Sequence, residues 1–296
     1  MALIPPQYLN AVVSIEVALK DKPESDNQTI ATGFLYGKLV SKDIEQDTST
    51  YSIYLVTNRH VFENSQGNQL EKVLLRFNLT QRRGTKCFEI NLLENGKPMW
   101  IKHSKKEVDL AIMRLNAQAM NKEGIDYYYF RNDTDIFLTK DFEEKGISTG
   151  DDIFVLGFPL GLRGSNRNYT IAKSGCISRI DEELLEKKYF YIDCSAYPGN
   201  SGGPVIHKPE FIAIGGTKCS GNAGLIGVVS SGEPFQDIAI SQQTGRARIV
   251  FEEQTGLVRV VPIDLIDDAI EQYNRSKGKP KENESVKKSS NTQTGT

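Results

Sequence analysis

The sequence has few of the residues that build metal or disulfide frameworks. Its 296 residues include four cysteines, three histidines and one tryptophan. The cysteines are widely separated, with no Cys-x-x-Cys pair, at Cys87, Cys176, Cys194 and Cys219. This spacing argues against a cysteine zinc site and against a disulfide framework. We therefore expect no metal, and the chemistry inferred below requires no organic cofactor.

Long apolar runs and targeting signals are also missing. The longest apolar stretches are a handful of residues, whereas a membrane-spanning helix needs about 20. The N-terminal segment 1–17 lacks the basic opening and the apolar core of a secretion signal. We expect no membrane association and a cytoplasmic location.

The charge is nearly balanced, with 36 basic and 38 acidic residues and a formal net charge of −2. This balance gives no reason to expect a nucleic acid as the main partner. The end of the chain differs, because residues 275–296 contain six basic and two acidic residues and no aromatic one. This composition predicts a disordered basic tail, which the chemistry below does not need. An electrostatic tether to RNA or to a partner is the alternative interpretation of the tail.

Short segments rich in β-branched and aromatic residues recur along the body and predict strands. They lie at 11–17, 32–40, 51–56, 73–79, 109–115, 152–158, 169–180, 189–194 and 225–230, with a hairpin-like segment at 247–261. No helix of crossover length separates them, so the sequence predicts an all-β, antiparallel fold of barrels or sandwiches. The polar stretch Asn116 to Gly150 divides the strands into two units. One amphipathic helix is predicted at about 264–274, where Ile266, Ala269, Ile270 and Tyr273 are spaced on one face.

The segment Pro198 to Pro204 reads PGNSGGP and lies between two predicted strands. A serine among glycines suits a nucleophile, because the backbone must turn tightly and approach a substrate carbonyl closely. An ordinary glycine-rich turn is the alternative. The segment also matches the Gly-x-Ser-x-Gly elbow of α/β hydrolases. In that class an acid and a histidine follow the serine, but the only histidine after Ser201 is His207, which lies six residues on in the next predicted strand. Pro204 also begins a strand rather than the helix of an elbow, so the class is excluded.

The sequence does contain candidate catalytic residues in the opposite order along the chain, with the histidine first and the serine last. His60 follows an apolar strand in TNRHVF, and Asp109 opens the strand DLAIMRL. Asp109 can supply a charged acceptor to the histidine, and Ser201 comes from the second unit. We therefore predict a site between the two units. For His103 and His207 we prefer surface or strand-edge positions without a catalytic role.

These blocks resemble the trypsin-like (chymotrypsin-fold) serine peptidases, and in finer detail the HtrA (Deg) branch. Four segments occur in the same order as in that branch. They are Thr32-Gly33-Phe34, VLGFPLG at 155–161, SGCIS at 174–178 and the segment around Ser201. The resemblance covers about residues 10–235. It implies two antiparallel six-stranded β-barrels and a C-terminal helix. The peptidase domain would span 1–274, with barrel 1 at about 8–120 and barrel 2 at about 148–262.

Several positions depart from secreted relatives. Val61 and Tyr197 replace cysteines that form disulfides in those enzymes, which agrees with a reducing compartment. Asn200 replaces the aspartate that pairs with a newly cut N-terminus in zymogens, so we expect no activation by cleavage. The 22 residues after Asn274 are too few for the PDZ domain of HtrA proteins, so we expect none.

The resemblance implies a serine endopeptidase that forms an acyl-enzyme on Ser201, with His60 as general base and Asp109 orienting the imidazole. The backbone N–H groups of Gly199 and Ser201 would form the oxyanion hole. Substrate binding is expected at Ser195, Ala196, Ser230, Ser231 and Gly232.

No carboxylate is expected at the pocket base, which favours an uncharged residue before the scissile bond. Glu233 or Asp237 would change this if either pointed inward. The expected partner is a protein or peptide substrate, with an activating protein as an addition if the oxyanion loop is latent. The alternative function is a silent or partner-activated scaffold with a protease fold.

Overall fold

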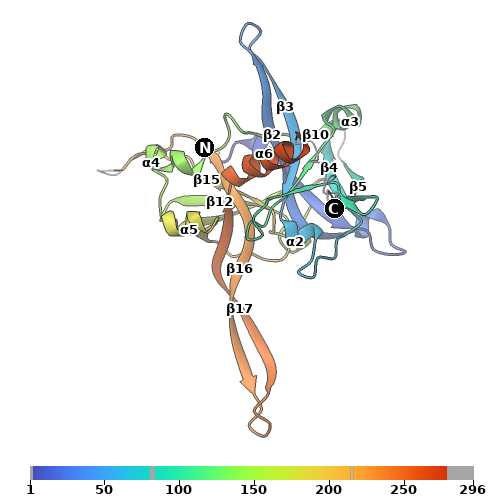
Figure 1. Cartoon of the computed structure of the whole chain (residues 1–296), viewed down its shortest axis with the longest axis vertical. Helices are drawn as coiled ribbons and strands as arrows, with labels where there is room; N and C mark the ends of the chain where they lie inside the picture. The colour runs from blue at the N-terminus through green and yellow to red at the C-terminus, as the bar shows by residue number, and fades with distance from the viewer. Residues whose placement is uncertain (1–2, 81–83, 214, 216, 279–296) are drawn as a thin grey trace, which may run out of the picture.

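The computed structural model describes residues 3–80, 84–213, 215 and 217–278. Strands dominate it, and one long helix lies across the middle of the body (Figure 1). Most of the predicted basic tail, residues 279–296, lies outside the described residues. The first part of that predicted tail is helical, because the final helix continues to Gly278.

The N-terminal unit is a nine-stranded sheet whose main path runs β10-β4-β1-β2-β3-β9-β8. β5 pairs with β4, and β11 pairs in parallel with β2. The strands of this sheet are β1 (Val12–Val17), β2 (Gln28–Asp43), β3 (Thr48–Thr57), β4 (Lys72–Leu79), β5 (Thr85–Asn91), β8 (Ile101–Lys102), β9 (Ala111–Arg114), β10 (Ile125–Asp126) and β11 (Phe130–Arg131). A small separate hairpin joins β6 (Leu93–Glu94) to β7 (Lys97–Pro98).

The C-terminal unit is a closed six-stranded barrel in the order β12-β13-β14-β17-β16-β15. Its strands are β12 (Asp152–Gly157), β13 (Ile171–Arg179), β14 (Phe190–Asp193), β15 (Pro204–His207), β16 (Gly224–Ile240) and β17 (Ala247–Pro262). The predicted all-β double-barrel architecture is therefore confirmed. The first unit has more strands than expected, because short strands from its loops and from the polar linker join the sheet.

Helices are short except for the last one. They are α1 (Pro6–Leu9), α2 (Arg59–Phe62), α3 (Ala117–Lys122), α4 (Phe142–Lys145), α5 (Glu182–Glu186) and α6 (Asp264–Gly278), with 3-10 turns η1 (Glu24–Asp26), η2 (Thr139–Asp141) and η3 (Pro159–Gly161). Among the described residues, no helix is both long enough and apolar enough to cross a membrane. None of the four cysteine thiols forms a disulfide within this part of the chain.

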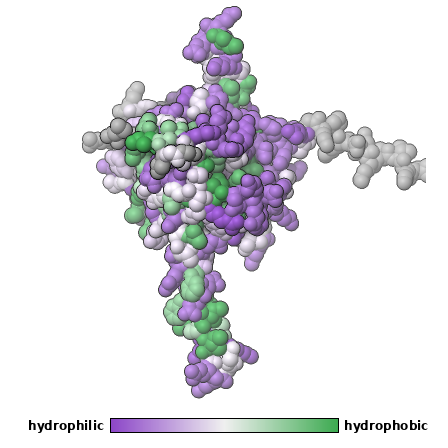
Figure 2. Space-filling view, turned by 90° about the vertical axis from the view of Figure 1, so that its left-hand side faces the viewer, coloured by the Kyte–Doolittle hydropathy of each residue, from purple (hydrophilic) through white to green (hydrophobic). Residues whose placement is uncertain are grey.

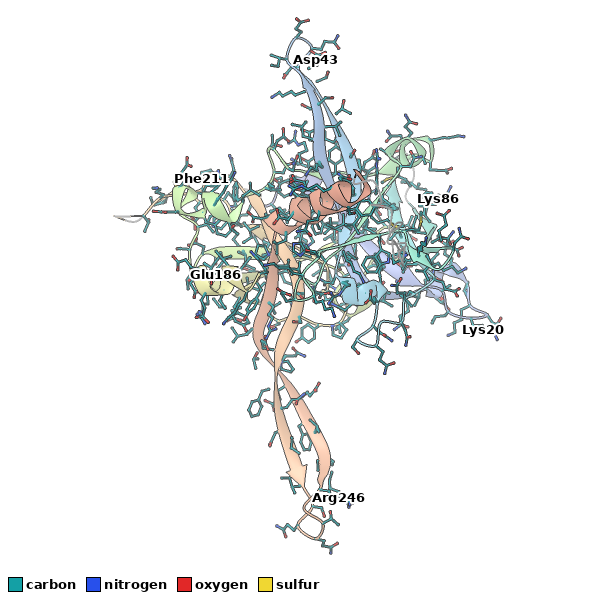
Figure 3. The ribbon with its side chains drawn as sticks, viewed as in Figure 1. Lys20, Asp43, Lys86, Glu186, Phe211 and Arg246 are labelled. Carbon is teal, nitrogen blue, oxygen red and sulfur yellow. The ribbon has the colours of Figure 1, made fainter. Side chains whose placement is uncertain are left out.

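Two long hairpins project from the body in opposite directions (Figure 1). The β2–β3 hairpin carries Asp43 near its tip, and the β16–β17 hairpin carries Arg246 at its tip (Figure 3). Hydrophobic residues continue far along the β16–β17 projection (Figure 2). The prediction of a hairpin within 247–261 was wrong: this segment is the single strand β17, and its partner is the distal half of β16.

Side chains alternate across each strand, so both faces of the two sheets are used. In β1 and β2, Ile15 and Leu35 belong to the core of barrel 1, while Val12 and Phe34 lie on the other face. Barrel 2 has its own core, which includes Ile192. The sequences of these strands are therefore mostly apolar, without a strict alternation of apolar and polar residues.

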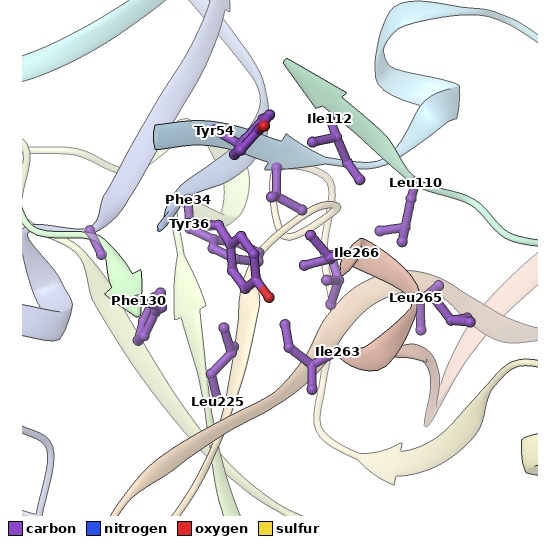
Figure 4. Packing of buried hydrophobic residues seen from close by; sticks show 14 of the residues in the cluster. Phe34, Tyr36, Tyr54, Leu110, Ile112, Phe130, Leu225, Ile263, Leu265 and Ile266 are labelled. Carbon is purple, nitrogen blue, oxygen red and sulfur yellow. The ribbon is translucent and has the colours of Figure 1, made fainter. Parts of the chain in front are cut away.

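The outward faces of the two barrels form a third core between them (Figure 4). Phe34 and Ile112 of the N-terminal sheet share this cluster with Leu225 of barrel 2. Helix α6 completes it through the predicted apolar face, and Ile266 and Ile270 are fully buried there. This interface core fixes the position of one barrel relative to the other.

Candidate active site

His60 lies in the short helix α2, directly after β3. The next two residues, Val61 and Phe62, are buried, and the Phe62 ring packs edge-on against Trp100. The Asn58 side chain, just before the helix, donates a 2.9 Å hydrogen bond to the Asp109 carbonyl. These contacts hold the helix in place while the His60 side chain stays about half exposed.

Asp109 precedes β9, and its carboxylate binds three donors. The distance from His60 Nδ1 to Asp109 Oδ2 is 2.7 Å, and the backbone N–H of His60 donates to Oδ1 at 3.1 Å. Ser230 Oγ, which comes from β16 of barrel 2, donates to Oδ2 at 2.9 Å. The sequence predicted Ser230 only as a wall of the substrate pocket, and its contact with Asp109 was missed because it is made across the barrel interface.

These hydrogen bonds keep the carboxylate charged. Burial acts to raise the pKa of Asp109, but the bonds from His60 and Ser230 outweigh it and leave the pKa below its usual value. A carboxylate that stays ionised can accept a hydrogen bond from Nδ1–H of His60. This bond fixes the tautomer in which Nε2 carries no proton.

Thr32 of β2 ties the serine loop to barrel 1. Its N–H donates to the Ser201 carbonyl at 3.0 Å, and its hydroxyl donates to the Gly199 carbonyl at 2.6 Å. The same hydroxyl accepts the N–H of Phe158 at 3.0 Å. A single buried side chain therefore joins β2, the end of β12 and the loop that carries Ser201.

The backbone of the loop leaves two amides free for a ligand. The Pro198 carbonyl accepts the Leu160 N–H at 2.7 Å, so in this trans peptide the Gly199 N–H points the opposite way. Among the described residues, neither this N–H nor that of Ser201 donates to another protein group. Gly199 has φ of 99°, and a Cβ there would lie 2.4 Å from the Phe158 carbonyl, so only glycine fits.

Asn200 is buried and stabilises the turn internally. Its side-chain Oδ1 accepts the backbone N–H of Tyr197 at 3.0 Å, and the Gly203 N–H donates to its carbonyl at 2.9 Å. Asn200 thus has a local role in shaping the loop. Within the described chain no hydrogen bond joins Ser201 to His60. Such contacts are often long without substrate and shorten when it binds.

A hollow of about 250 Å³ lies beside Ser201. Four of the predicted substrate-binding residues line it, namely Ala196, Ser230, Ser231 and Gly232. Ser195 is not among the lining residues, and its carbonyl instead accepts a hydrogen bond from Lys173. Glu252 and Gln254 of β17 also line the hollow. No sequence pattern predicted these two residues, because the pairing of β17 with β16 is what brings them to the hollow.

Glu233 and Asp237, which would have altered the charge preference of the pocket, do not point into it. Glu233 pairs with Arg259 and accepts a hydrogen bond from Tyr191. Asp237 is exposed and lies opposite Phe251 on the projecting hairpin. Neither lines the hollow.

The two remaining histidines, expected at the surface or at a strand edge, are both buried, and His207 is the last residue of its strand. His103 Nδ1 accepts the Lys105 N–H at 3.1 Å, and its other ring nitrogen lies 3.3 Å from the Gln272 amide of α6. His207 ends β15 with no exposed surface. None of the contacts that these two histidines make in the described residues is with His60, Asp109 or Ser201.

The chain was compared with protein families, with curated proteins and with solved structures. A family model described as a trypsin-like peptidase domain matches residues 31–214. No curated protein matches. Solved structures that match include the MamO protease domain from Magnetospirillum magneticum, with 14% identity, 89% of this chain and 97% of that chain covered, and a TM-score of 0.45. The inactive form of the Rv3671c protease, from M. tuberculosis H37Rv, matches with 16% identity, 90% and 89% coverage and a TM-score of 0.41.

We predict that Thr32→Val lowers the free energy of unfolding by roughly 2 to 4 kcal/mol. The valine leaves the buried Gly199 carbonyl and Phe158 N–H without partners, and each such group costs about 1 to 3 kcal/mol. Thr32→Ser keeps the hydroxyl and loses one methyl group, so its loss is expected near 1 kcal/mol. Urea unfolding of both variants tests this, and equal stability of the two would contradict it.

Proposed function

The chain belongs to the trypsin-like peptidase family, and we propose that it is a serine endopeptidase that cleaves peptide bonds through an acyl-enzyme on Ser201. The observation that carries this proposal is the Asp109 carboxylate, which binds His60 of its own unit and Ser230 across the barrel interface. A carboxylate that orients a half-exposed imidazole next to a serine loop is the arrangement that activates a serine nucleophile.

The reaction follows from the roles of these groups. Ser201 Oγ attacks the peptide carbonyl carbon while His60 Nε2 takes the hydroxyl proton. The tetrahedral intermediate carries its negative oxygen toward the free N–H groups of Gly199 and Ser201. His60 then gives its proton to the leaving amine, and the C–N bond breaks. Water, deprotonated by His60, hydrolyses the ester, and the proton returns to Ser201.

We predict that a fluorophosphonate probe labels the wild-type protein on Ser201 with loss of fluoride. Ser201→Ala should abolish labelling, and in a peptide-cleavage assay it should lower kcat by about 10⁶. Ser195→Ala is the matched control, because this serine lies in the same segment but not in the hollow. Mass spectrometry of the labelled peptide identifies the site. Wild-type protein that stays unlabelled, alone and with its substrates, would favour a protease-fold binding protein instead.

We also propose that the residue before the scissile bond is uncharged. A lysine or arginine in the hollow would need a buried acidic partner. Glu252 is exposed at the hollow and already accepts a 2.7 Å hydrogen bond from Gln236. Cleavage of a peptide library should therefore favour uncharged residues, and Glu252→Gln should not change this preference. A preference for lysine or arginine that disappears in Glu252→Gln would show that this carboxylate sets the specificity.

A further inference from the structure

Three potential metal ligands meet at the end of barrel 2 that lies away from the Ser201 loop. β15 begins three residues after Ser201 and ends at His207, which pairs with Ile153 near the start of β12. Antiparallel pairing thus brings Asp151, just before β12, beside His207. Glu210 follows in the loop after β15. One ligand atom from each of Asp151, His207 and Glu210 lies within 4.8 Å of the others.

The His207 side chain is fully buried and aimed at this cluster. Neither ring nitrogen has a hydrogen-bond partner among the described residues. Its Nε2 lies 3.5 Å from Asp151 Oδ2, which is beyond an ordinary hydrogen bond. Phe137 packs edge-on against the imidazole, with 6.2 Å between ring centres. A buried polar group without a partner is costly, so a ligand on His207 would remove that penalty.

The donor set suits one class of ion. We propose that Asp151, His207 and Glu210 bind a divalent transition-metal ion such as Zn²⁺, with water completing the coordination. Ligands about 2.1 Å from a tetrahedral ion lie about 3.4 Å apart, close to the separation of His207 and Asp151. The imidazole favours Zn²⁺ over Ca²⁺, which prefers oxygen ligands.

The surroundings support the same assignment. The Ser148 N–H donates to Asp151 Oδ2 at 2.6 Å and orients the carboxylate. The neighbouring Asp152 is paired with Lys208 at 3.2 Å, so that lysine already has an acidic partner. The Gly221 N–H donates to the Glu210 carbonyl at 2.9 Å and holds the loop. The ion would join this loop to the start of β12 and stabilise the far end of the barrel.

Metal analysis after equilibrium dialysis of the untagged, metal-stripped protein against Zn²⁺ tests the site. We expect one equivalent per chain and a rise in melting temperature of roughly 5 to 10 °C at one hundred times the Kd. Asp151→Asn and Glu210→Gln should each weaken binding at least about tenfold. Asp152→Asn, which removes the same charge one residue along, should bind as wild type.

His60→Ala separates this site from the active-site imidazole, and it should still bind one equivalent. Zn²⁺ binding that is lost in His60→Ala but kept in Glu210→Gln would overturn the proposal. Tighter binding of Ca²⁺ than of Zn²⁺, or no bound metal at all, would overturn it as well. Co²⁺ loaded in place of Zn²⁺ should give visible absorption bands that Glu210→Gln alters.

A second, independent observation concerns the projecting β16–β17 ribbon, residues 234–254 (Figure 1). Its large apolar side chains are about half exposed, at Phe235, Ile238, Ile240, Ile249, Val250 and Phe251. The neighbouring pairs Ile238–Val250 and Asp237–Phe251 point to opposite faces, so both faces are apolar. An isolated two-stranded ribbon is only marginally stable in water, and exposed apolar surface of this kind marks an interaction site.

The charges along the ribbon identify the partner. Arg246 lies at the tip (Figure 3), and Arg248 follows it at the start of β17. Asp237, Glu252 and Glu253 lie nearer the body. In an antiparallel two-fold arrangement the tip of one ribbon lies beside the base of the other. We infer that two copies of this chain associate through their ribbons, because this arrangement brings opposite charges and apolar faces together.

Sedimentation velocity should show a dimer that Val250→Asp converts to monomer. Val40→Asp is the control, because Val40 is also exposed, on the other projecting hairpin. Arg246→Glu/Arg248→Glu and Glu252→Arg/Glu253→Arg should each weaken self-association, and mixing the two variants should restore a dimer. A monomer at about 100 µM, where a micromolar dimer would be mostly formed, would overturn the inference. So would a monomer that sediments with lipid vesicles.

Discussion

The hydrogen bonds of Thr32, made by its backbone N–H and its side-chain hydroxyl, are the interactions on which the site depends. Its N–H and hydroxyl bind the carbonyls on either side of Asn200, and the hydroxyl also accepts the N–H of Phe158. These bonds fix the serine loop of barrel 2 against a strand of barrel 1. Because the carbonyls of Gly199 and Ser201 are bound, the loop has a defined path, and among the described residues its amides at Gly199 and Ser201 stay without a protein acceptor. Without the hydroxyl, the loop would keep only the backbone bond from Thr32 to Ser201 among the hydrogen bonds that join it to barrel 1 in the described residues.

A second hydrogen bond across the interface lets barrel 2 support a residue of the N-terminal unit. Ser230 of barrel 2 donates to Asp109 of the N-terminal unit, so each unit supports a functional side chain of the other. The apolar core between the barrels makes both links possible, since it sets the separation that these short hydrogen bonds require. Helix α6 buries Ile266 and Ile270 in that core. The terminal helix therefore contributes to the site without lying in it.

Barrel 2 also presents two further features, a proposed metal site at the far end of β15 and a projecting ribbon whose base lines the hollow beside Ser201. β15 connects the Ser201 loop to His207, so one four-residue strand runs from the nucleophile to the proposed metal site. β16 passes Ser230 and continues into the projecting ribbon. The same two strands thus join the reactive groups to surfaces that an ion and a second copy of the chain would occupy.

The sequence by itself determined the double β architecture, the terminal helix and the three candidate reactive residues, His60, Asp109 and Ser201. Those features are local: strand period, helical spacing and a glycine-rich turn are written in neighbouring residues. Tertiary structure alone decided that Ser230 binds Asp109, that Glu252 lines the hollow and that His207 meets Asp151. Each of these contacts joins residues distant in the chain, and it depends on strand register and barrel packing, which no local pattern encodes.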